Sequence, residues 1–482
     1  MKLKEIIQGI AAEVRGDVEV EVKDLQFDSR SVSQGTLFVA QPGTKVDGHD
    51  YIAKAVEAGA VAIICQQVPA GAPAATYIVV DDSSRALGLA AANFYGHPSR
   101  RIRLVGITGT NGKTTTVTLL HRMFRSLGRH VGLISTIVNK IDDEEIPTGH
   151  TTPDALELNR LIGRMVEAGC EYCFMEVSSH AVVQQRIAGL EFAGGIFSNI
   201  THDHLDFHKT MQAYIAAKKG FFDALSVSAW ALVNVDDKNG RVMVQNTRAQ
   251  VKTYALRQTA DFHGKIVEEG FEGMQLRING QEVWSRLVGR FNAYNLLAIY
   301  GAAVLCGVPA GEALRVLSLL TPAPGRFQYV SGKGITAIVD YAHTPDALQN
   351  VLETIHDLRR DTQQIITVVG CGGDRDRTKR PEMARIAMLG SDKLVLTSDN
   401  PRTEQPEAIL NDMEAGLTAE QLSHVVRITD RRQAIRTACL MAREGDIILV
   451  AGKGHEKYQE VNGVRSHFDD VEELETELGI KS

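Results

Sequence analysis

The sequence predicts an α/β protein of three domains, and three observations support this prediction. The chain has 482 residues, which is long for a single domain. Short apolar runs alternate with helical patterns along most of it, which is typical of mostly parallel sheets covered by helices. Proline-containing segments at 97–101 and 322–326 interrupt this alternation. We therefore expect domains at 1–98, 99–328 and 329–482, the central one a P-loop domain and the last one Rossmann-like.

The composition excludes several classes of protein. A net charge of −7 argues against general nucleic-acid binding. Six cysteines in a chain of this length are not a disulfide framework, and the CxxC pair Cys170 and Cys173 starts an apolar run, so we interpret both as packing residues. The longest uncharged run, 293–311, contains Asn295 and Pro309 and predicts a buried helix followed by a turn rather than a membrane span.

The first two domains begin with clear strand patterns. In the first domain, the runs 35–40 and 60–64 are strand candidates. In the second, the apolar run 102–107 predicts a buried strand, and further candidates follow at 131–134, 173–177, 196–200 and 231–235.

The strand 102–107 leads into a glycine-rich loop and then into a helical pattern. Glycines stand at 106, 109 and 112, followed by Lys113 and Thr114. Loop N–H groups, a helix N-terminus, a lysine and a hydroxyl together form an anion cradle that can also hold Mg²⁺. The spacing departs from the strict P-loop pattern, because Ile107 occupies the position of its first glycine. We predict that the chain binds a nucleoside triphosphate.

The third domain opens with the strand 335–340, and three later strands each lead into a polar loop. The strands 365–369, 394–396 and 447–450 precede the loops 370–377, 398–402 and 452–456, respectively. Ligands of open α/β sheets bind outside the carboxyl ends of the strands, so these loops predict a shared polar pocket. The glycines at 370–373 are only a weak dinucleotide motif, because a full GxGxxG is absent.

Two polar features of the central domain could hold a metal. Glu176 ends a predicted strand, where a carboxylate can bind Mg²⁺, although a surface glutamate is the alternative. The cluster of His202, Asp203 and His204, with Asp206 and His208 beyond it, resembles the transition-metal site of a hydrolase. Its alternative is a loop of hydrogen-bonding histidines.

The helical segment 214–222 carries two adjacent lysines, Lys218 and Lys219. By residue physics alone they are ordinary helix-surface lysines. A partly buried lysine would differ, because a lowered pKa yields a reactive neutral amine.

These features together resemble the Mur ligase family of peptidoglycan precursor synthesis. The motifs that carry the resemblance are TGTNGKTT at 108–115, EVSSH at 176–180, NITHDHLDFH at 199–208, YIAAK at 214–218, FNAYN at 291–295, PGRF at 324–327 and DYAHTPDAL at 340–348. They span nearly the whole chain. In that family the three domains bind, in order, a UDP-sugar, ATP and an amino acid.

The resemblance implies roles for the cofactor residues. Lys218 would be carbamylated and would bind Mg²⁺ together with Thr114, Glu176 and His204. Lys113 would bind the phosphates. The catalytic residues would then be Lys113, Lys218, Glu176 and His204, and the metal ligands Thr114, Glu176, His204 and Lys218. The remaining ATP contacts implied are Gly109, Thr110, Asn111, Gly112, Thr115, Asn295, Arg326 and Asp340.

The resemblance also implies the substrate contacts. Ser29 would bind the uridine, and the muramoyl-dipeptide would contact Thr151, Thr152, Ser178, Gln184 and Arg186. The sequence DNPR, formed by Asp399, Asn400, Pro401 and Arg402, resembles a diaminopimelate-selecting motif, with Arg375, Gly452 and Glu456 as further contacts. An arginine suits the second carboxylate of diaminopimelate, which lysine lacks. His150 departs from relatives that carry asparagine there.

The activity that this resemblance implies is ATP-dependent addition of meso-diaminopimelate to UDP-N-acetylmuramoyl-L-alanyl-D-glutamate through an acyl phosphate. We expect a cytoplasmic monomer with small-molecule substrates, no nucleic-acid partner and no membrane insertion. The alternatives are a lysine-adding ligase of the same family, a folylpolyglutamate-type ligase, a metallohydrolase built on His202, Asp203 and His204, and a nucleotide switch without catalysis.

Overall fold

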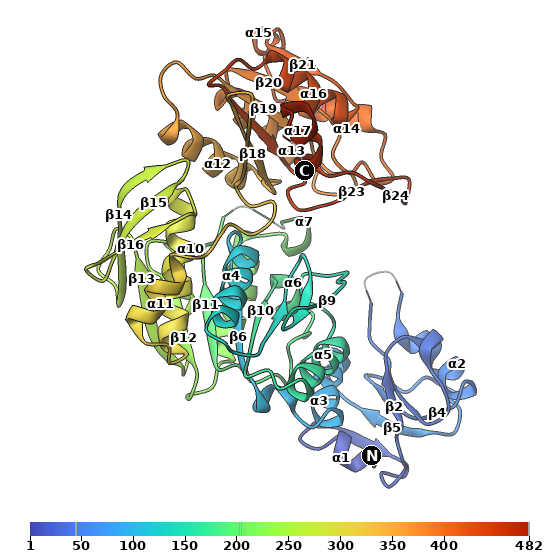
Figure 1. Ribbon diagram of the computed structural model, residues 1–482. Helices are drawn as coiled ribbons and strands as arrows, with labels where there is room; N and C mark the ends of the chain where they lie inside the picture. The colour runs from blue at the N-terminus through green and yellow to red at the C-terminus, as the bar shows by residue number, and fades with distance from the viewer. Residues whose placement is uncertain (44–45, 202, 204, 481–482) are drawn as a thin grey trace.

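The computed structural model describes residues 1–43, 46–201, 203 and 205–480. Three separate large sheets succeed one another along the chain, and the central one lies between the other two (Figure 1). The predicted α/β class with three sheet-based parts is therefore confirmed. No helix within the described ranges is long and apolar enough to cross a membrane.

The N-terminal sheet has the strand order β1-β5-β4-β3-β2, in which β1 alone runs antiparallel to its neighbour. Its strands are β1 (Glu13–Arg15), β2 (Asp24–Gln26), β3 (Thr36–Val39), β4 (Ala60–Cys65) and β5 (Thr76–Val79). Its helices are α1 (Leu3–Ile6), α2 (Ile52–Glu57) and α3 (Ser83–Phe94), with 3₁₀ turns at Ser29–Ser31, Gly48–Tyr51 and Pro98–Arg101. The predicted strands at 35–40 and 60–64 are confirmed as β3 and β4.

The central sheet has the order β16-β15-β14-β13-β12-β11-β6-β10-β7-β8-β9, parallel from β14 to β7 and antiparallel in the hairpins at both edges. Its first strands are β6 (Arg103–Thr108), β7 (Val131–Ile134), β8 (Asn139–Ile141), β9 (Glu144–Ile146), β10 (Tyr172–Glu176) and β11 (Gly194–Phe197). The others are β12 (Trp230–Asn234), β13 (Gln250–Ala255), β14 (Phe262–Gly270), β15 (Gly273–Ile278) and β16 (Gln281–Ser285).

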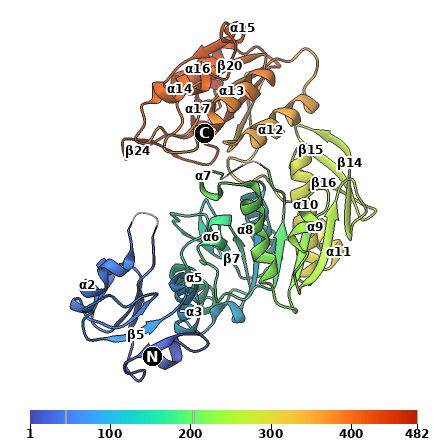
Figure 2. The same ribbon diagram turned by 180° about the vertical axis from the view of Figure 1, so that it is seen from behind.

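Helices cover both faces of the central sheet, as Figures 1 and 2 show from opposite sides. They are α4 (Lys113–Ser126), α5 (Ala155–Glu167), α6 (Ser179–Val183), α7 (Leu205–His208), α8 (Met211–Asp223), α9 (Gly240–Met243), α10 (Arg290–Leu305) and α11 (Ala310–Leu317). Strand β6 is buried on both faces, because Val105 and Ile107 pack with α4 and α10 while Leu104 packs with α5 and α8. The uncharged run beginning at 293 forms the buried helix α10, as predicted, and Cys170 and Cys173 are buried packing residues in the core beside α5.

The C-terminal sheet has the order β17-β18-β22-β19-β20-β21, in which only β17 is antiparallel. Its strands are β17 (Gln328–Gly332), β18 (Ile335–Asp340), β19 (Ile365–Val369), β20 (Lys393–Leu396), β21 (Val425–Arg427) and β22 (Ile447–Ala451), and the hairpin β23 (Tyr458–Val461) and β24 (Val464–His467) follows. The helices are α12 (Pro345–Leu358), α13 (Lys379–Leu389), α14 (Pro406–Glu414), α15 (Ala419–Leu422), α16 (Arg431–Met441) and α17 (Asp470–Leu478). All four strands predicted here are present.

A buried ion pair fastens the last helix to this sheet. The Arg431 guanidinium donates to both carboxylate oxygens of Asp470 at 2.8 and 2.7 Å and to the carbonyl of Ala451 at 3.1 Å. Both charged side chains have zero exposure. The pair therefore ties α16 and α17 to the end of β22, where the loop 452–456 begins.

Replacement of Asp470 by alanine should lower the free energy of unfolding of the C-terminal domain by about 3–5 kcal/mol, because it leaves the Arg431 charge buried and unpaired. The matched control is Glu473→Ala, which removes the more exposed pair with Arg432 and should cost less than about 1 kcal/mol. Urea denaturation of the two variants measures both values. Equal, small losses would show that the buried pair does not hold α17.

Candidate active site

The glycine loop between β6 and α4 has the geometry of an anion cradle. Gly109 and Gly112 have φ values of 155° and 87°, and Gly112 caps the N-terminus of α4. A Cβ on Gly109 would lie 1.9 Å from Ser198 Oγ, and a Cβ on Gly112 would lie 2.4 Å from Asn295 Oδ1. Both glycines are therefore required by close packing. Ile107, which stands where the strict P-loop pattern has its first glycine, is a buried residue of β6, so this departure does not disturb the loop.

Two lysines converge on one backbone carbonyl of this loop. Lys113 Nζ donates to the carbonyl of Gly109 at 3.0 Å and to that of Thr110 at 2.9 Å. Lys218 Nζ, from α8, donates to the same Gly109 carbonyl at 2.7 Å. Burial and the neighbouring Lys113 charge lower the pKa of Lys218 well below its usual value. Burial also lowers the pKa of Lys113, and Glu176 and Asp203 oppose this effect.

The expectation that Lys218 is a surface lysine is wrong. Its exposure is 1%, and its Nζ lies 4.5 Å from the centre of the Tyr214 ring. The buried positions of α8 are Tyr214, Ala217, Lys218, Phe221 and Phe222, which is the spacing of a core-facing helix stripe. That periodicity was the available signal. Its neighbour Lys219 instead forms an ion pair with Asp223 within the helix.

Glu176 ends β10 and is buried, with 1% exposure, so the surface alternative is wrong. Its carboxylate accepts hydrogen bonds from the Thr136 amide at 2.8 Å and the Thr136 hydroxyl at 3.1 Å. The Thr151 hydroxyl lies 3.1 Å from Thr136 Oγ1 and can donate a hydrogen bond to it. Because β10 pairs with β6 in parallel register, the carboxylate lies at the sheet edge from which the glycine loop emerges.

The C-terminal domain contacts the glycine loop directly. Asn111 Nδ2 donates to Asp346 at the start of α12 at 2.6 Å. Arg326 Nη2 donates to Thr114 Oγ1 at 3.3 Å, and its guanidinium lies 4.7 Å from the centre of the Tyr341 ring. Asp346 and Tyr341 were not among the predicted contacts.

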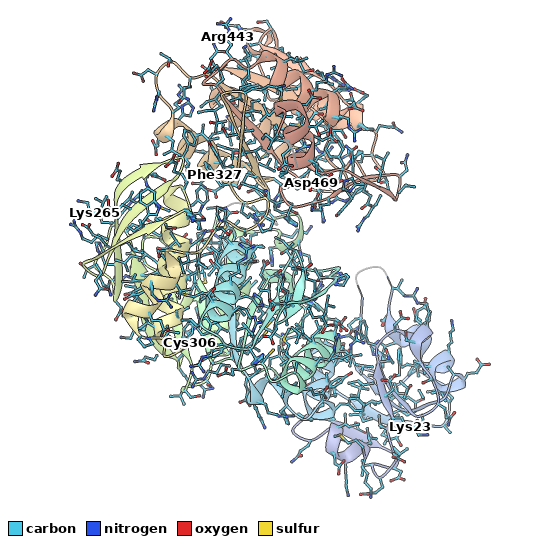
Figure 3. All side chains as sticks on the ribbon, viewed as in Figure 1. Lys23, Lys265, Cys306, Phe327, Arg443 and Asp469 are labelled. Carbon is cyan, nitrogen blue, oxygen red and sulfur yellow. The ribbon has the colours of Figure 1, made fainter. Side chains whose placement is uncertain are left out.

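Asp340 lies beside this junction. It accepts a hydrogen bond of 2.6 Å from the amide of Phe327, which lies between the central and C-terminal sheets (Figure 3). Burial raises the pKa of Asp340 to about 6, although the Arg326 cation opposes the shift. Arg326 and Asp340 thus lie in one region with the glycine loop, and Asn295 packs against Gly112.

A cavity of about 850 Å³ lies between the N-terminal and central domains. Ser29, His150, Gln184 and Arg186, all named from the sequence, line this cavity together with Phe27, Asp28, Arg30 and Asp154. The structure therefore brings together these four residues from segments far apart in the chain.

The other predicted dipeptide contacts form a hydrogen-bonded group behind the cavity. Thr152 Oγ1 donates to the Glu176 carbonyl at 2.9 Å and accepts a hydrogen bond from the Ser178 amide at 3.1 Å. Arg186 donates to the Thr152 carbonyl at 2.6 Å and to the Gln184 side chain at 2.6 Å. This group links the cavity to the Glu176 strand end.

The three polar loops of the C-terminal sheet meet at one edge, as predicted. A Cβ on Gly370 would lie 2.3 Å from the Thr397 carbonyl, and one on Gly452 would lie 2.5 Å from Asp399 Oδ2. Asn400 Nδ2 donates to Glu456 Oε2 at 2.7 Å. The fully buried Lys453, which was not predicted, lies between these side chains.

Arg402 is held against the first of these loops. Its guanidinium donates to the Gly373 carbonyl at 2.7 Å, and its backbone has a φ of 53°. Arg375 is exposed in the same loop, and the packing of both side chains around Gly372 brings the two arginines near each other. Pro401 is buried beside them. Two cationic side chains thus lie close together where these loops meet.

His202 and His204, on which the metallohydrolase interpretation depends, lie outside the described residues. Asp203 is described, and its charge acts on Lys113 and Lys218.

Three family models match the chain over most of its length. They are "Mur ligase family, catalytic domain" over 21–95, "Mur ligase middle domain" over 107–303 and "Mur ligase, glutamate ligase domain" over 325–454. The UDP-N-acetylmuramoyl-L-alanyl-D-glutamate--2,6-diaminopimelate ligase of Phocaeicola vulgatus is 56% identical over 477 residues, which are 98% of this chain and 99% of that protein. The chain belongs to the Mur ligase family.

Solved structures of Mur ligases have the same architecture. One of a UDP-N-acetylmuramoyl-L-alanyl-D-glutamate--2,6-diaminopimelate ligase matches with a TM-score of 0.71 and 34% identity, and the match covers 99% of both chains. The MurF ligase of Thermotoga maritima, solved in complex with ADP, matches with a TM-score of 0.62 at 19% identity, over 96% of this chain and 99% of that one, and so shows the fold alone. The predictions of the family, the fold and an ATP-dependent ligase are confirmed.

Replacement of Gly112 by alanine should raise the KM for ATP at least about tenfold, because the left-handed backbone and the contact with Asn295 both oppose a side chain. Gly128→Ala is the matched control. Gly128 follows the same helix with a φ of 74°, and nothing lies within 4 Å of its Cβ position, so only strain is added. Steady-state kinetics with varied ATP measure the KM of both variants. A normal KM for ATP in Gly112→Ala would contradict phosphate binding by this loop.

Proposed function

We propose that this Mur ligase adds meso-diaminopimelate to UDP-N-acetylmuramoyl-L-alanyl-D-glutamate, with ATP, through an acyl phosphate. The observation that carries the proposal is the pairing of two sites on one chain. One is a glycine loop with two lysines on a single carbonyl, and the other is the cluster of C-terminal loops that carries Arg402 and Glu456. High identity to relatives named for this reaction supports it.

The glycine loop and α4 would bind the triphosphate. The N–H groups at the start of α4 and the Lys113 ammonium offer positive charge to the phosphates, and Arg326 reaches the same first turn from the domain junction. Asn295 and Asp340 would contact the rest of the nucleotide. Because the donors are already in place, little reorganisation accompanies phosphoryl transfer to the D-glutamate carboxylate.

The residues around Gly109 fit a magnesium site if Lys218 does not carry a positive charge. The hydroxyl of Thr114 and the buried carboxylate of Glu176 are oxygen ligands that suit Mg²⁺, and we assign His204 to the same site. An ammonium on Lys218 would repel the ion. When bound, Mg²⁺ would neutralise charge on the triphosphate.

Carbamylation of Lys218 removes this conflict. The lowered pKa of Lys218 favours the neutral amine, whose nitrogen attacks the carbon of CO₂ and then loses a proton. The product is a carbamate, which replaces a cation with an anion beside Lys113. The shared carbonyl of Gly109 holds both lysine nitrogens in the required positions.

The pocket of the C-terminal domain would present the incoming diaminopimelate. Arg402 and Arg375 would bind the carboxylate at the far end of the molecule, and Glu456 the ammonium of the same centre. The amine of the near centre then attacks the acyl phosphate, and a tetrahedral intermediate expels phosphate. Contacts such as Asn111 with Asp346 bring this domain onto the glycine loop, which would exclude water from the acyl phosphate.

The remaining parts of the proposal follow from this reaction. The cavity at Ser29, Gln184 and Arg186 would hold the UDP-sugar end, with Thr151, Thr152 and Ser178 toward the dipeptide. We propose domain limits at 1–98, 99–328 and 329–482, a monomeric enzyme, and the cytoplasm as its location, because ATP is the energy source.

Replacement of Lys218 by alanine should lower kcat by about a hundredfold or more, because one ligand of the metal is lost. Added acetate should partly restore activity by supplying a carboxylate. Lys219→Ala, on the same helix and outside the site, should retain kcat. Phosphate release measures all three, and equal activity of Lys218→Ala and the parent without acetate would contradict the carbamate.

Phosphate release with the UDP-dipeptide, ATP and Mg²⁺ should occur with meso-diaminopimelate and not with L-lysine. Arg402→Ala should raise the KM for diaminopimelate about a hundredfold with little change in the KM for ATP, because a charged hydrogen bond to the distal carboxylate is lost. Arg377→Ala, an exposed arginine of the neighbouring loop that pairs with Glu404, is the control. Release with lysine would point to the lysine-adding relative.

A further inference from the structure

The C-terminal pocket contains a lysine that none of the roles above uses. Lys453 follows β22 and has no exposure to solvent. Its Nζ lies 3.1 Å from Asn400 Oδ1, 3.3 Å from Glu456 Oε2 and 4.0 Å from Asp399 Oδ1. A buried ammonium is unfavourable unless it is paired and hydrogen-bonded, so this lysine depends on the two carboxylates around it.

Lys453 and the Glu460 amide together determine which way the Asn400 amide points. Asn400 Oδ1 accepts hydrogen bonds from Lys453 Nζ and from the Glu460 amide at 2.9 Å, so this end of the amide must be the oxygen. The NH₂ end therefore faces Glu456 and donates to its Oε2 at 2.7 Å. A reversed amide would place its NH₂ group against two donors. Lys453 thus contacts the Glu456 carboxylate both directly and through Asn400.

Lys453 also sets the charge of the pocket. Asp399 and Glu456 are two carboxylates in one buried cluster, and burial, together with the repulsion from Asp399, raises the pKa of Glu456. The Lys453 cation and the Asn400 amide act in the opposite direction. With both carboxylates ionised and Lys453 charged, this group of three carries one net negative charge. A ligand with one ammonium would balance it.

We propose that Lys453 is a positioning residue that orients Glu456 to receive the distal ammonium of a diamino acid. Both of its contacts to Glu456, direct and through Asn400, fall on Oε2, so Oε1 would be the oxygen that receives the ligand. The Tyr458 ring, 5.4 Å from Lys453 Nζ, supports the ammonium from the hairpin β23–β24. The inference deepens the function proposed above and rests on it.

The test compares two ligands that differ only at the distal amine. 2-Aminopimelate keeps both carboxylates of diaminopimelate and lacks that amine. In Lys453→Met, the KM for diaminopimelate should rise about tenfold to a hundredfold, the size expected for a hydrogen bond to a charged group. The inhibition constant of 2-aminopimelate, measured as a competitor of diaminopimelate, should change less than about threefold. The KM for ATP should be unchanged.

A merely structural role would weaken both ligands equally, and this result, or no change in either constant, would overturn the proposal. Lys457→Met is the matched control, because Lys457 lies four residues further on, is exposed and pairs with Asp469. If thermal unfolding shows that Lys453→Met does not fold, Lys453→Gln takes its place, because it removes the same charge with an amide that keeps a donor. The KM for diaminopimelate and the inhibition constant of 2-aminopimelate are then compared in the same way.

The two proposals fail in different ways. If the unmodified protein does not use diaminopimelate, the proposed function is wrong. If it uses diaminopimelate and the lysine variants weaken both ligands by the same factor, only the role of Lys453 is wrong.

Discussion

One hydrogen-bonded arrangement governs the chemistry of this protein: two lysine side chains on the carbonyl of Gly109. Two ammonium groups this close repel each other, and one of them, on Lys218, is buried in the stripe by which α8 packs on the sheet. Loss of the charge on one lysine removes this repulsion, and burial favours that loss at Lys218. The proposed conversion of Lys218 into a carbamate would remove this repulsion and would create an anionic ligand beside the phosphate cradle.

The same principle of charge balance recurs in the C-terminal domain. There Lys453 is buried among Asp399, Asn400 and Glu456, and Arg431 is buried against Asp470 at the end of the same strand. Buried ionic groups contribute little net stability but fix the geometry of their partners. If Lys218 is carbamylated as proposed, the central domain neutralises its buried cation, whereas the C-terminal domain pairs its buried cations with carboxylates.

Much of this arrangement could be predicted from the sequence, because strands such as 365–369 and the glycine loop are local patterns. The convergence of the loops after β19, β20 and β22 followed from the rule for open sheets. The burial of Lys218 could not be read from its charge, and its partner Gly109 lies 109 residues away. The burial of Lys453 could likewise not be predicted, since a lysine in a polar glycine loop is usually solvated. The roles of most site residues came from family resemblance rather than from residue physics.

The most direct test of this account is ¹³C NMR of the protein incubated with ¹³C-bicarbonate and Mg²⁺. A carbamate resonance should be present in the parent protein and in Lys219→Ala and absent in Lys218→Ala. A fully active protein without this resonance would contradict the carbamate, because Lys218 would then supply no anionic ligand and another explanation of the metal site would be required.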